Sequence, residues 1–93
     1  MVLPAEVSKN LLLEAIEPTY PEQALKAGIE GPVTFLASIG RDGRIEQLKL
    51  VRGYFVLAEA AYHAVKQWRY KPYVLDGQTV EAQTYVTVDF RHP

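Results

Sequence analysis

The residues of this chain that could carry out catalysis are few and lie far apart. Its two histidines are His63 and His92, and both acid–base and metal chemistry require partners at set spacing. The chain has no cysteine, which excludes disulfides and thiolate metal sites. The cluster "GRDG" (40–43) is not followed by Gly-Lys-Ser/Thr, so it is not a phosphate-binding loop. We therefore expect no catalytic residue, no metal and no cofactor, and we predict that the protein is not an enzyme.

An aromatic and basic cluster, "AVKQWRYKP" (64–72), contains the residue types that bind nucleic acid or a membrane surface. The formal net charge of -1 gives no reason to expect a polyanionic partner. Trp68 continues an apolar helical stripe, and the basic residues around it stand where cations complement a helix dipole. We interpret the cluster as the end of a helix that Pro72 prevents from continuing, and we expect no nucleic-acid binding.

The composition, 48% apolar and 23% charged over 93 residues, is typical of one small globular domain. We predict a single domain over residues 1–93, with its core at 17–91 and residues 1–12 as a candidate flexible lead-in. No apolar run approaches the length that crosses a bilayer, and no signal-peptide pattern opens the chain. Membrane attachment would require an anchor that is absent from this sequence.

Two segments form a predicted hairpin. Residues 32–39 alternate and place on one face Val33, Phe35, Ala37 and Ile39. The turn residues Asp42-Gly43 then lead into residues 44–51. The apolar residues of this second segment change parity partway along, which predicts either a bulge or a strand that pairs over only part of its length.

Two helices are predicted. Pro21 suits the first turn of a short helix, and Gly28 suits the position just after its end. A longer helix is indicated by an apolar stripe of Leu57, Ala60, Ala61, Ala64, Val65 and Trp68. Residues 11–18 are predicted to be extended, because Pro18 disfavours helical backbone at the residue before it.

Residues 80–90 alternate almost without interruption between apolar and polar side chains. A strand with one polar face is typical of an antiparallel sheet that has helices on its other face. Because the long helix carries the chain back after the hairpin, the last strand can complete an antiparallel sheet only beside the first hairpin strand. We predict a two-layer α+β fold: a three-stranded antiparallel sheet of order 2-1-3, two helices on one face, and a short extended N-terminal segment.

In this topology residues 80–90 form an exposed edge of the sheet. Such edges usually carry lysine, proline or bulges that prevent pairing with other chains, and the middle of this edge has none. We therefore predict that it binds another strand through Gln83, Thr84, Tyr85, Val86, Thr87, Val88 and Asp89. If residues 1–12 covered this edge, they would have to be displaced before a partner could bind.

With these elements in place, the chain resembles the C-terminal domain of TonB-family energy transducers. The resemblance rests on "PTYPEQALKAGIEGPVTF", "GRDGRI", "LAEAAYHAVKQWRYKP" and "VTVDF", and it covers residues 17–91. The joint order and spacing of these motifs is specific, although each motif alone is weak. Within them, structural roles are expected for Tyr20, Pro21, Gly31, Gly43, Trp68 and Pro72.

The resemblance implies a periplasmic domain that an N-terminal anchor tethers to the inner membrane. It implies that the domain grips the TonB box of an outer-membrane transporter by strand addition, and transmits proton-gradient energy for siderophore or nutrient uptake. ExbB and ExbD are the implied partners of the missing N-terminal region. Glu17 is a further candidate contact, since it stands where the family commonly has a glutamine next to the box. That departure leaves the preferred box sequence open.

Two alternatives stay open at this point. The same exposed edge favours self-association, including a strand-exchanged homodimer. The polar sheet face that carries Gln83 and Thr87 is compatible with attachment to peptidoglycan. Light scattering over a concentration series would test the first alternative, and a pull-down with purified peptidoglycan would test the second.

Overall fold

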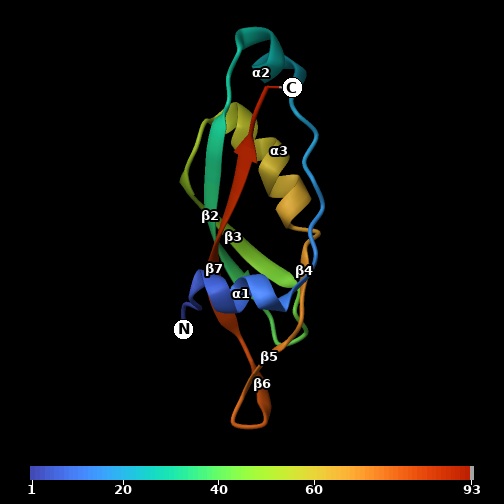
Figure 1. Cartoon of the computed structure of the whole chain (residues 1–93), viewed down its shortest axis with the longest axis vertical. Coiled ribbons are helices and arrows are strands. Elements are labelled where there is room, and N and C mark those ends of the chain that lie inside the picture. The colour runs from blue at the N-terminus through green and yellow to red at the C-terminus, as the bar shows by residue number, and fades with distance from the viewer. Residues whose placement is uncertain (93) are drawn as a thin grey trace.

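The computed structural model describes residues 1–92, an elongated molecule of 50 × 20 × 20 Å (Figure 1). Within these residues the elements, in chain order, are α1 (Ala5–Leu11), β1 (Leu12–Glu14), α2 (Glu22–Ala27), β2 (Gly31–Ile39), β3 (Ile45–Arg52), α3 (Phe55–Val65), β4 (Arg69–Tyr70), β5 (Tyr73–Leu75), β6 (Gln78–Val80) and β7 (Ala82–Phe90). None of the described helices is long and apolar enough to cross a membrane.

The main sheet has the strand order β3-β2-β7, and both pairings are antiparallel. This confirms the predicted α+β fold and the order 2-1-3. The inward face of β2 and β7 packs against α3, whose small alanines allow a close approach (Figure 1). The core consists mainly of Val33, Phe35, Ala37, Ile39, Leu57, Ala61, Val65, Val86, Val88 and Phe90.

The hairpin between β2 and β3 contains the predicted irregularity. Ser38 pairs with Gln47 but Ile39 pairs with Ile45, so Glu46 is an extra residue in β3. This confirms the first of the two predicted alternatives, a bulge, and explains the change of parity. Because of the extra residue, Ile45 faces the core on the same side of the sheet as Leu48 and Leu50.

Both predicted helices are present, and the second is shorter than its apolar stripe. Gly28 ends α2 in the left-handed conformation, with φ of 68°. The helix α3 ends at Val65, whereas the stripe predicted continuation to Trp68. The backbone N–H of Trp68 donates to the carbonyl of Val65 at 2.9 Å, a tighter turn than that of an α-helix. Arg69–Tyr70 can then form β4, so "WRYKP" is not simply the end of a helix.

The N-terminal residues contain an element that the sequence analysis did not predict. Ala5–Leu11 form the additional helix α1, and of the predicted extended segment 11–18 only Leu12–Glu14 form a strand. A helix of 7 residues is marginal alone, so its packing beside β7 must stabilise it (Figure 1). The strand β1 pairs with β4 and fixes this segment to the body of the domain.

The predicted strand 80–90 is interrupted at Glu81. Val80 pairs with Tyr73 in the two-stranded hairpin β5–β6, which projects at one end of the molecule (Figure 1). The turn of this hairpin has positive φ at Asp76 and Gly77. The edge strand β7 therefore has 9 residues, from Ala82 to Phe90.

Candidate functional site

The edge of β7 presents backbone groups that β2 does not use. Gln83 shows their direction: its N–H donates to the carbonyl of Met1 at 2.8 Å, and its carbonyl accepts from the N–H of Leu3 at 2.7 Å. Because a strand repeats every two residues and the β2–β7 register has no shift, the backbone groups of Tyr85, Thr87 and Asp89 also point outward.

These outward groups lack backbone partners over most of the strand. Within residues 1–92, no backbone hydrogen bond from another segment reaches Tyr85, Thr87 or Asp89. Their side chains are exposed, whereas those of the intervening residues are buried. The polar ladder of an added strand could therefore form without disturbing the core.

The opposite edge of the sheet is not suited to strand addition. On β3 the register shifts twice, leaving Glu46 and Val51 as extra residues, and Lys49 is exposed between them. Bulges and charged side chains prevent an edge from pairing with another chain. Of the two edges of the main sheet, only that of β7 is regular.

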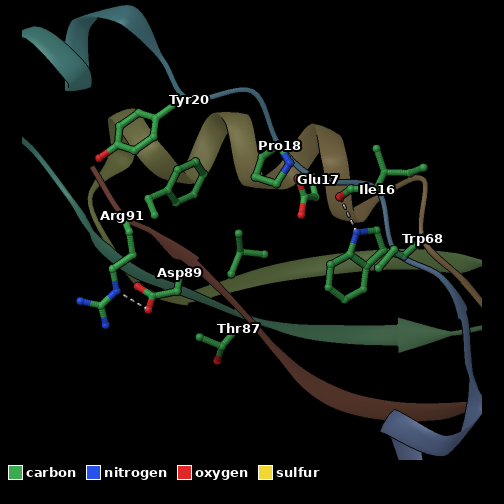
Figure 2. A pocket seen from close by; sticks show the side chains of 11 residues that line it. Ile16, Glu17, Pro18, Tyr20, Trp68, Thr87, Asp89 and Arg91 are labelled. Atoms are coloured by element: carbon green, nitrogen blue, oxygen red, sulfur yellow. Dashed lines mark hydrogen bonds and ion pairs between the residues drawn. The ribbon is translucent and has the colours of Figure 1, made fainter. Parts of the chain in front are cut away.

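A groove of about 440 Å³ runs beside the open part of this edge (Figure 2). We call it the β7 groove. It is lined by residues 15–18, Tyr20, Trp68 and residues 87–91. The loop 15–18 forms one side and the end of β7 forms the other, so an extended segment that entered the groove would lie alongside the free backbone groups.

Two hydrogen bonds hold the loop side of the groove. The indole Nε1 of Trp68 donates to the carbonyl of Ile16 at 2.9 Å (Figure 2), and the Tyr20 hydroxyl donates to the carbonyl of Ile29 at 2.5 Å. The Tyr20 ring meets that of Phe90 edge-on, with centroids 5.4 Å apart. Burial, and secondarily the charge of Glu30, raises the pKa of Tyr20.

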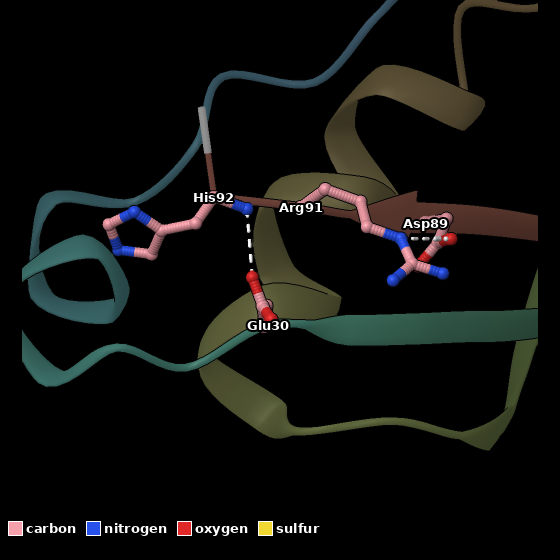
Figure 3. A network of polar contacts seen from close by, with 4 residues as sticks. All are labelled: Glu30, Asp89, Arg91 and His92. Carbon is pink, nitrogen blue, oxygen red and sulfur yellow. Dashed lines mark hydrogen bonds and ion pairs between the residues drawn. The ribbon is translucent and has the colours of Figure 1, made fainter.

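Two of the three carboxylates around the groove have a hydrogen-bond partner, and the third, Glu17, has no ion-pair partner among residues 1–92. The Asp89 carboxylate accepts from Nε of Arg91 at 2.9 Å, and Glu30 accepts the backbone N–H of His92 at 2.9 Å (Figure 3). Glu17 forms no ion pair with any residue in 1–92, and its side chain points toward the groove (Figure 2). Glu17 is thus an unpaired carboxylate on the loop side.

The other residues given structural roles lie at turns and element ends. Gly31 begins β2 with φ of 140°, and Pro21 directly precedes α2. Gly43 lies in the hairpin turn beside Tyr70, and Pro72 separates β4 from β5. Pro32 lacks an N–H, and it is tolerated because it lies opposite Asp89, beyond the last residue of β3 that pairs with β2.

Sequence reasoning named the edge but missed two parts of the site. It did not predict that Met1 and Leu3 occupy the backbone groups of Gln83. It also gave no sign that Ile16, Trp68 and Arg91 line a groove, because these residues belong to no common periodic pattern. Within the described chain, no three His, Asp or Glu side chains are grouped so that they could bind a metal ion.

Comparisons with known proteins agree on one family. The sequence pattern described as "Gram-negative bacterial TonB protein C-terminal" matches residues 16–92. The chain is 34% identical over 91 residues to Protein TonB of Vibrio cholerae, and 34% identical over 68 residues to Protein TonB of Pseudomonas aeruginosa. These matches cover 95% and 71% of this chain but only 37% and 20% of the two relatives.

Solved structures give the same result. The solution structure of the Pseudomonas aeruginosa TonB C-terminal domain matches with a TM-score of 0.71 and 30% identity, over 86% of this chain and 83% of that one. The TonB2 protein from Vibrio anguillarum matches with a TM-score of 0.65 and 34% identity, over 89% of this chain and 81% of that one.

Proposed function

Since this chain belongs to the Gram-negative bacterial TonB protein C-terminal family, we propose that it is a binding domain that adds a segment of an outer-membrane transporter to the edge of β7. The segment would be the TonB box, lying in the β7 groove. The observation that carries this proposal is the row of outward backbone groups at Tyr85, Thr87 and Asp89, which have no backbone partner in residues 1–92.

Strand addition suits a domain that transmits force. The main-chain hydrogen bonds of an added strand act in parallel, so that a pull along the strand is shared among them. These bonds depend little on side chains, so they tolerate variation in the bound sequence. The loop 15–18 would supply the side-chain contacts that distinguish one partner segment from another.

Membership of the family supports a wider role as part of this proposal. The domain would work in the periplasm, tethered to the inner membrane through an N-terminal region outside this sequence. ExbB and ExbD would act on that region and supply energy from the proton gradient. In this role the domain binds and pulls, and catalyses no reaction.

The proposal is tested by titrating the ¹⁵N-labelled domain with a panel of TonB-box peptides. We expect the amide resonances of Tyr85, Thr87 and Asp89 to shift, and we expect Thr87→Pro to abolish binding because it removes an outward N–H. Thr87→Ala is the matched control, since it removes the side chain and keeps the N–H. Its amide spectrum, and that of Thr87→Pro, would establish that both variants are folded.

Two results would count against strand addition. One is equal affinity of Thr87→Pro, Thr87→Ala and the unmodified chain for the same peptide. The other is peptide-induced shifts that are confined to β3 or to the β5–β6 hairpin, with none on β7.

Self-association is a second candidate, because the free backbone groups of β7 would also pair with β7 of another copy. Such a pairing would compete with a peptide for Tyr85 and Thr87. Light scattering over a concentration series decides between the two, since a chain that stays monomeric at high concentration leaves the peptide as the partner.

A further inference from the structure

One end of the edge of β7 is already occupied by the same chain. Val2 forms a parallel bridge with Gln83, and the flanking residues Met1 and Leu3 make the two hydrogen bonds with the backbone of Gln83. These are the bonds that a foreign strand would make at this position. The chain thus provides its own short strand where the proposed ladder begins.

The bridge continues into a helix that crosses beside β7 towards β4 (Figure 1). After Pro4 the chain forms α1, and a cavity of about 180 Å³ between α1 and β7 is lined in part by Ser8, Tyr85 and Thr87. We call residues 1–10 the covering segment. It occupies the backbone of Gln83 and lies beside the next two outward positions, while the β7 groove at residues 87–91 stays open.

The covering segment is held by few interactions. Only Leu3 and Ser8 are buried in it, with 4% and 5% exposed, and the Ser8 hydroxyl bonds within α1, to the carbonyl of Ala5. Pro4 provides no side-chain hydrogen bond at the start of the helix. A helix of 7 residues contributes little stability of its own, so the segment can open at a small cost.

A firm attachment follows directly after the segment. The N–H of Lys71 donates to the carbonyl of Leu11 at 2.7 Å, and Leu12 pairs with Tyr70. Residues 1–10 could therefore leave β7 while Leu11 and β1 stay in place. The boundary between the detachable and the fixed part would lie between Asn10 and Leu11.

We propose that the covering segment is a displaceable cover of the edge of β7, and that a partner strand pairing along the whole strand has to release it. This inference rests on the proposed function. A short partner would bind at Thr87 and Asp89 with the cover in place. A longer one would compete with Met1 and Leu3 for the backbone of Gln83, and its affinity would be lowered by the fraction of time that the cover is closed.

A disulfide between Val2→Cys and Gln83→Cys tests this directly. The chain has no cysteine of its own, and paired strands lie about 4.7–4.9 Å apart, within the range that a disulfide spans. We expect the oxidised form to bind a peptide long enough to reach Gln83 roughly threefold to tenfold more weakly than the reduced form. A shorter peptide that pairs only with residues 87–91 should bind the oxidised and reduced forms equally.

A second pair of variants avoids the disulfide. Leu3→Ala removes the buried side chain of the cover and should strengthen binding of the long peptide, while Val2→Ala, whose side chain is 48% exposed, should leave it unchanged. The proposal of a displaceable cover would be overturned if the oxidised and reduced forms bound the long peptide equally and the Leu3 amide resonance did not shift on binding. In that case the proposed function would stand.

Failure of every peptide to bind would count against the proposed function, not against the cover. Hydrogen exchange tests the cover without any peptide. The amide of Gln83 should exchange faster than that of Val86, which faces β2, because the cover opens without unfolding the sheet. Leu3→Ala should speed exchange at Gln83 alone. Protection of Gln83 equal to that of Val86 would overturn the inference.

Discussion

The indole of Trp68 joins two parts of the chain that are 52 residues apart, because its Nε1 donates to the carbonyl of Ile16 at 2.9 Å. Trp68 follows α3, while Ile16 belongs to the loop on one side of the β7 groove. One side chain therefore couples the end of a core helix to the surface proposed to receive the partner strand.

Trp68→Phe should separate the packing of the ring at the end of α3 from its hydrogen bond to the loop 15–18. The substitution keeps an aromatic ring and removes the donor to Ile16, which should cost about 1–3 kcal/mol of unfolding free energy through the lost hydrogen bond and the smaller ring. The amide resonances of residues 15–17 should shift, because the Ile16 carbonyl loses its donor. Denaturant unfolding and ¹⁵N–¹H spectra measure these effects, and unchanged resonances at residues 15–17 would contradict them. Trp68→Ala should cost more, roughly 3–5 kcal/mol.

Gly43 should be the least replaceable glycine of the described chain. Its φ is 85°, and a Cβ there would lie 1.9 Å from the carbonyl oxygen of Tyr70. Gly43→Ala should therefore destabilise the domain by at least about 3 kcal/mol or prevent folding. Gly77→Ala is the control, since its φ is 80° and no atom lies within 4 Å of its Cβ. It should cost only about 1–2 kcal/mol, and equal costs would show that the contact with Tyr70 is unimportant.

The parts of the fold that follow a repeating pattern could be predicted from the sequence. The alternation around Phe35 and the helical stripe around Ala61 each show which face of the element is buried, and both residues are buried in the core. The strand order followed from chain direction alone. Neither argument needed a contact between distant residues.

The parts that depend on single distant contacts could not be predicted. The helix α1 and the bridge of Val2 with Gln83 form because Leu3 finds a buried site beside β7, and a segment so short has no local preference that reveals this. The β7 groove likewise depends on the bond from Trp68 to Ile16. Local sequence identified the free edge and left open whether residues 1–12 cover it, but it did not show that Met1 and Leu3 bind Gln83.

Glu46 should make the stability of the domain depend on pH. Its pKa is raised from the ordinary value of 4.5, mainly by a hydrogen bond with Glu81, then by burial and by the charges of Glu81 and Asp42. A raised folded-state pKa means that the proton stabilises the fold. This contribution is fully present below 4.5 and is lost as pH rises through the folded-state value.

Glu46→Gln should therefore raise the melting temperature at neutral pH and flatten its dependence on pH in the acid range. Thermal unfolding over a pH series provides the measurement. Glu59→Gln, on the exposed face of α3, is the control for removing a carboxylate elsewhere. A melting temperature that falls in Glu46→Gln at neutral pH would contradict the expected sign.

Thr84→Val should stabilise the domain. Thr84 is 1% exposed, and its Oγ1 has no hydrogen-bond partner among the described residues. Valine has nearly the same shape and removes the cost of burying an unbonded hydroxyl, so the unfolding free energy should rise by about 1 kcal/mol. Thr34→Val is the matched control, because the Thr34 and Thr87 hydroxyl oxygens lie 2.9 Å apart and share a hydrogen bond. It should destabilise the domain, and a gain in both variants would refute the argument.

Glu17 should select the charge of the partner segment. An added strand points every second side chain toward the loop 15–18, where Glu17 is unpaired, and we expect a peptide with lysine at that position to bind about two- to fivefold tighter than one with glutamate. The preference should weaken with salt, vanish in Glu17→Gln and reverse in Glu17→Lys. Glu14→Gln, outside the groove, should leave it unchanged. A preference that persists in Glu17→Gln would place the selecting charge elsewhere. Asp89, which pairs with Arg91 in the groove lining, would then be the side chain to test.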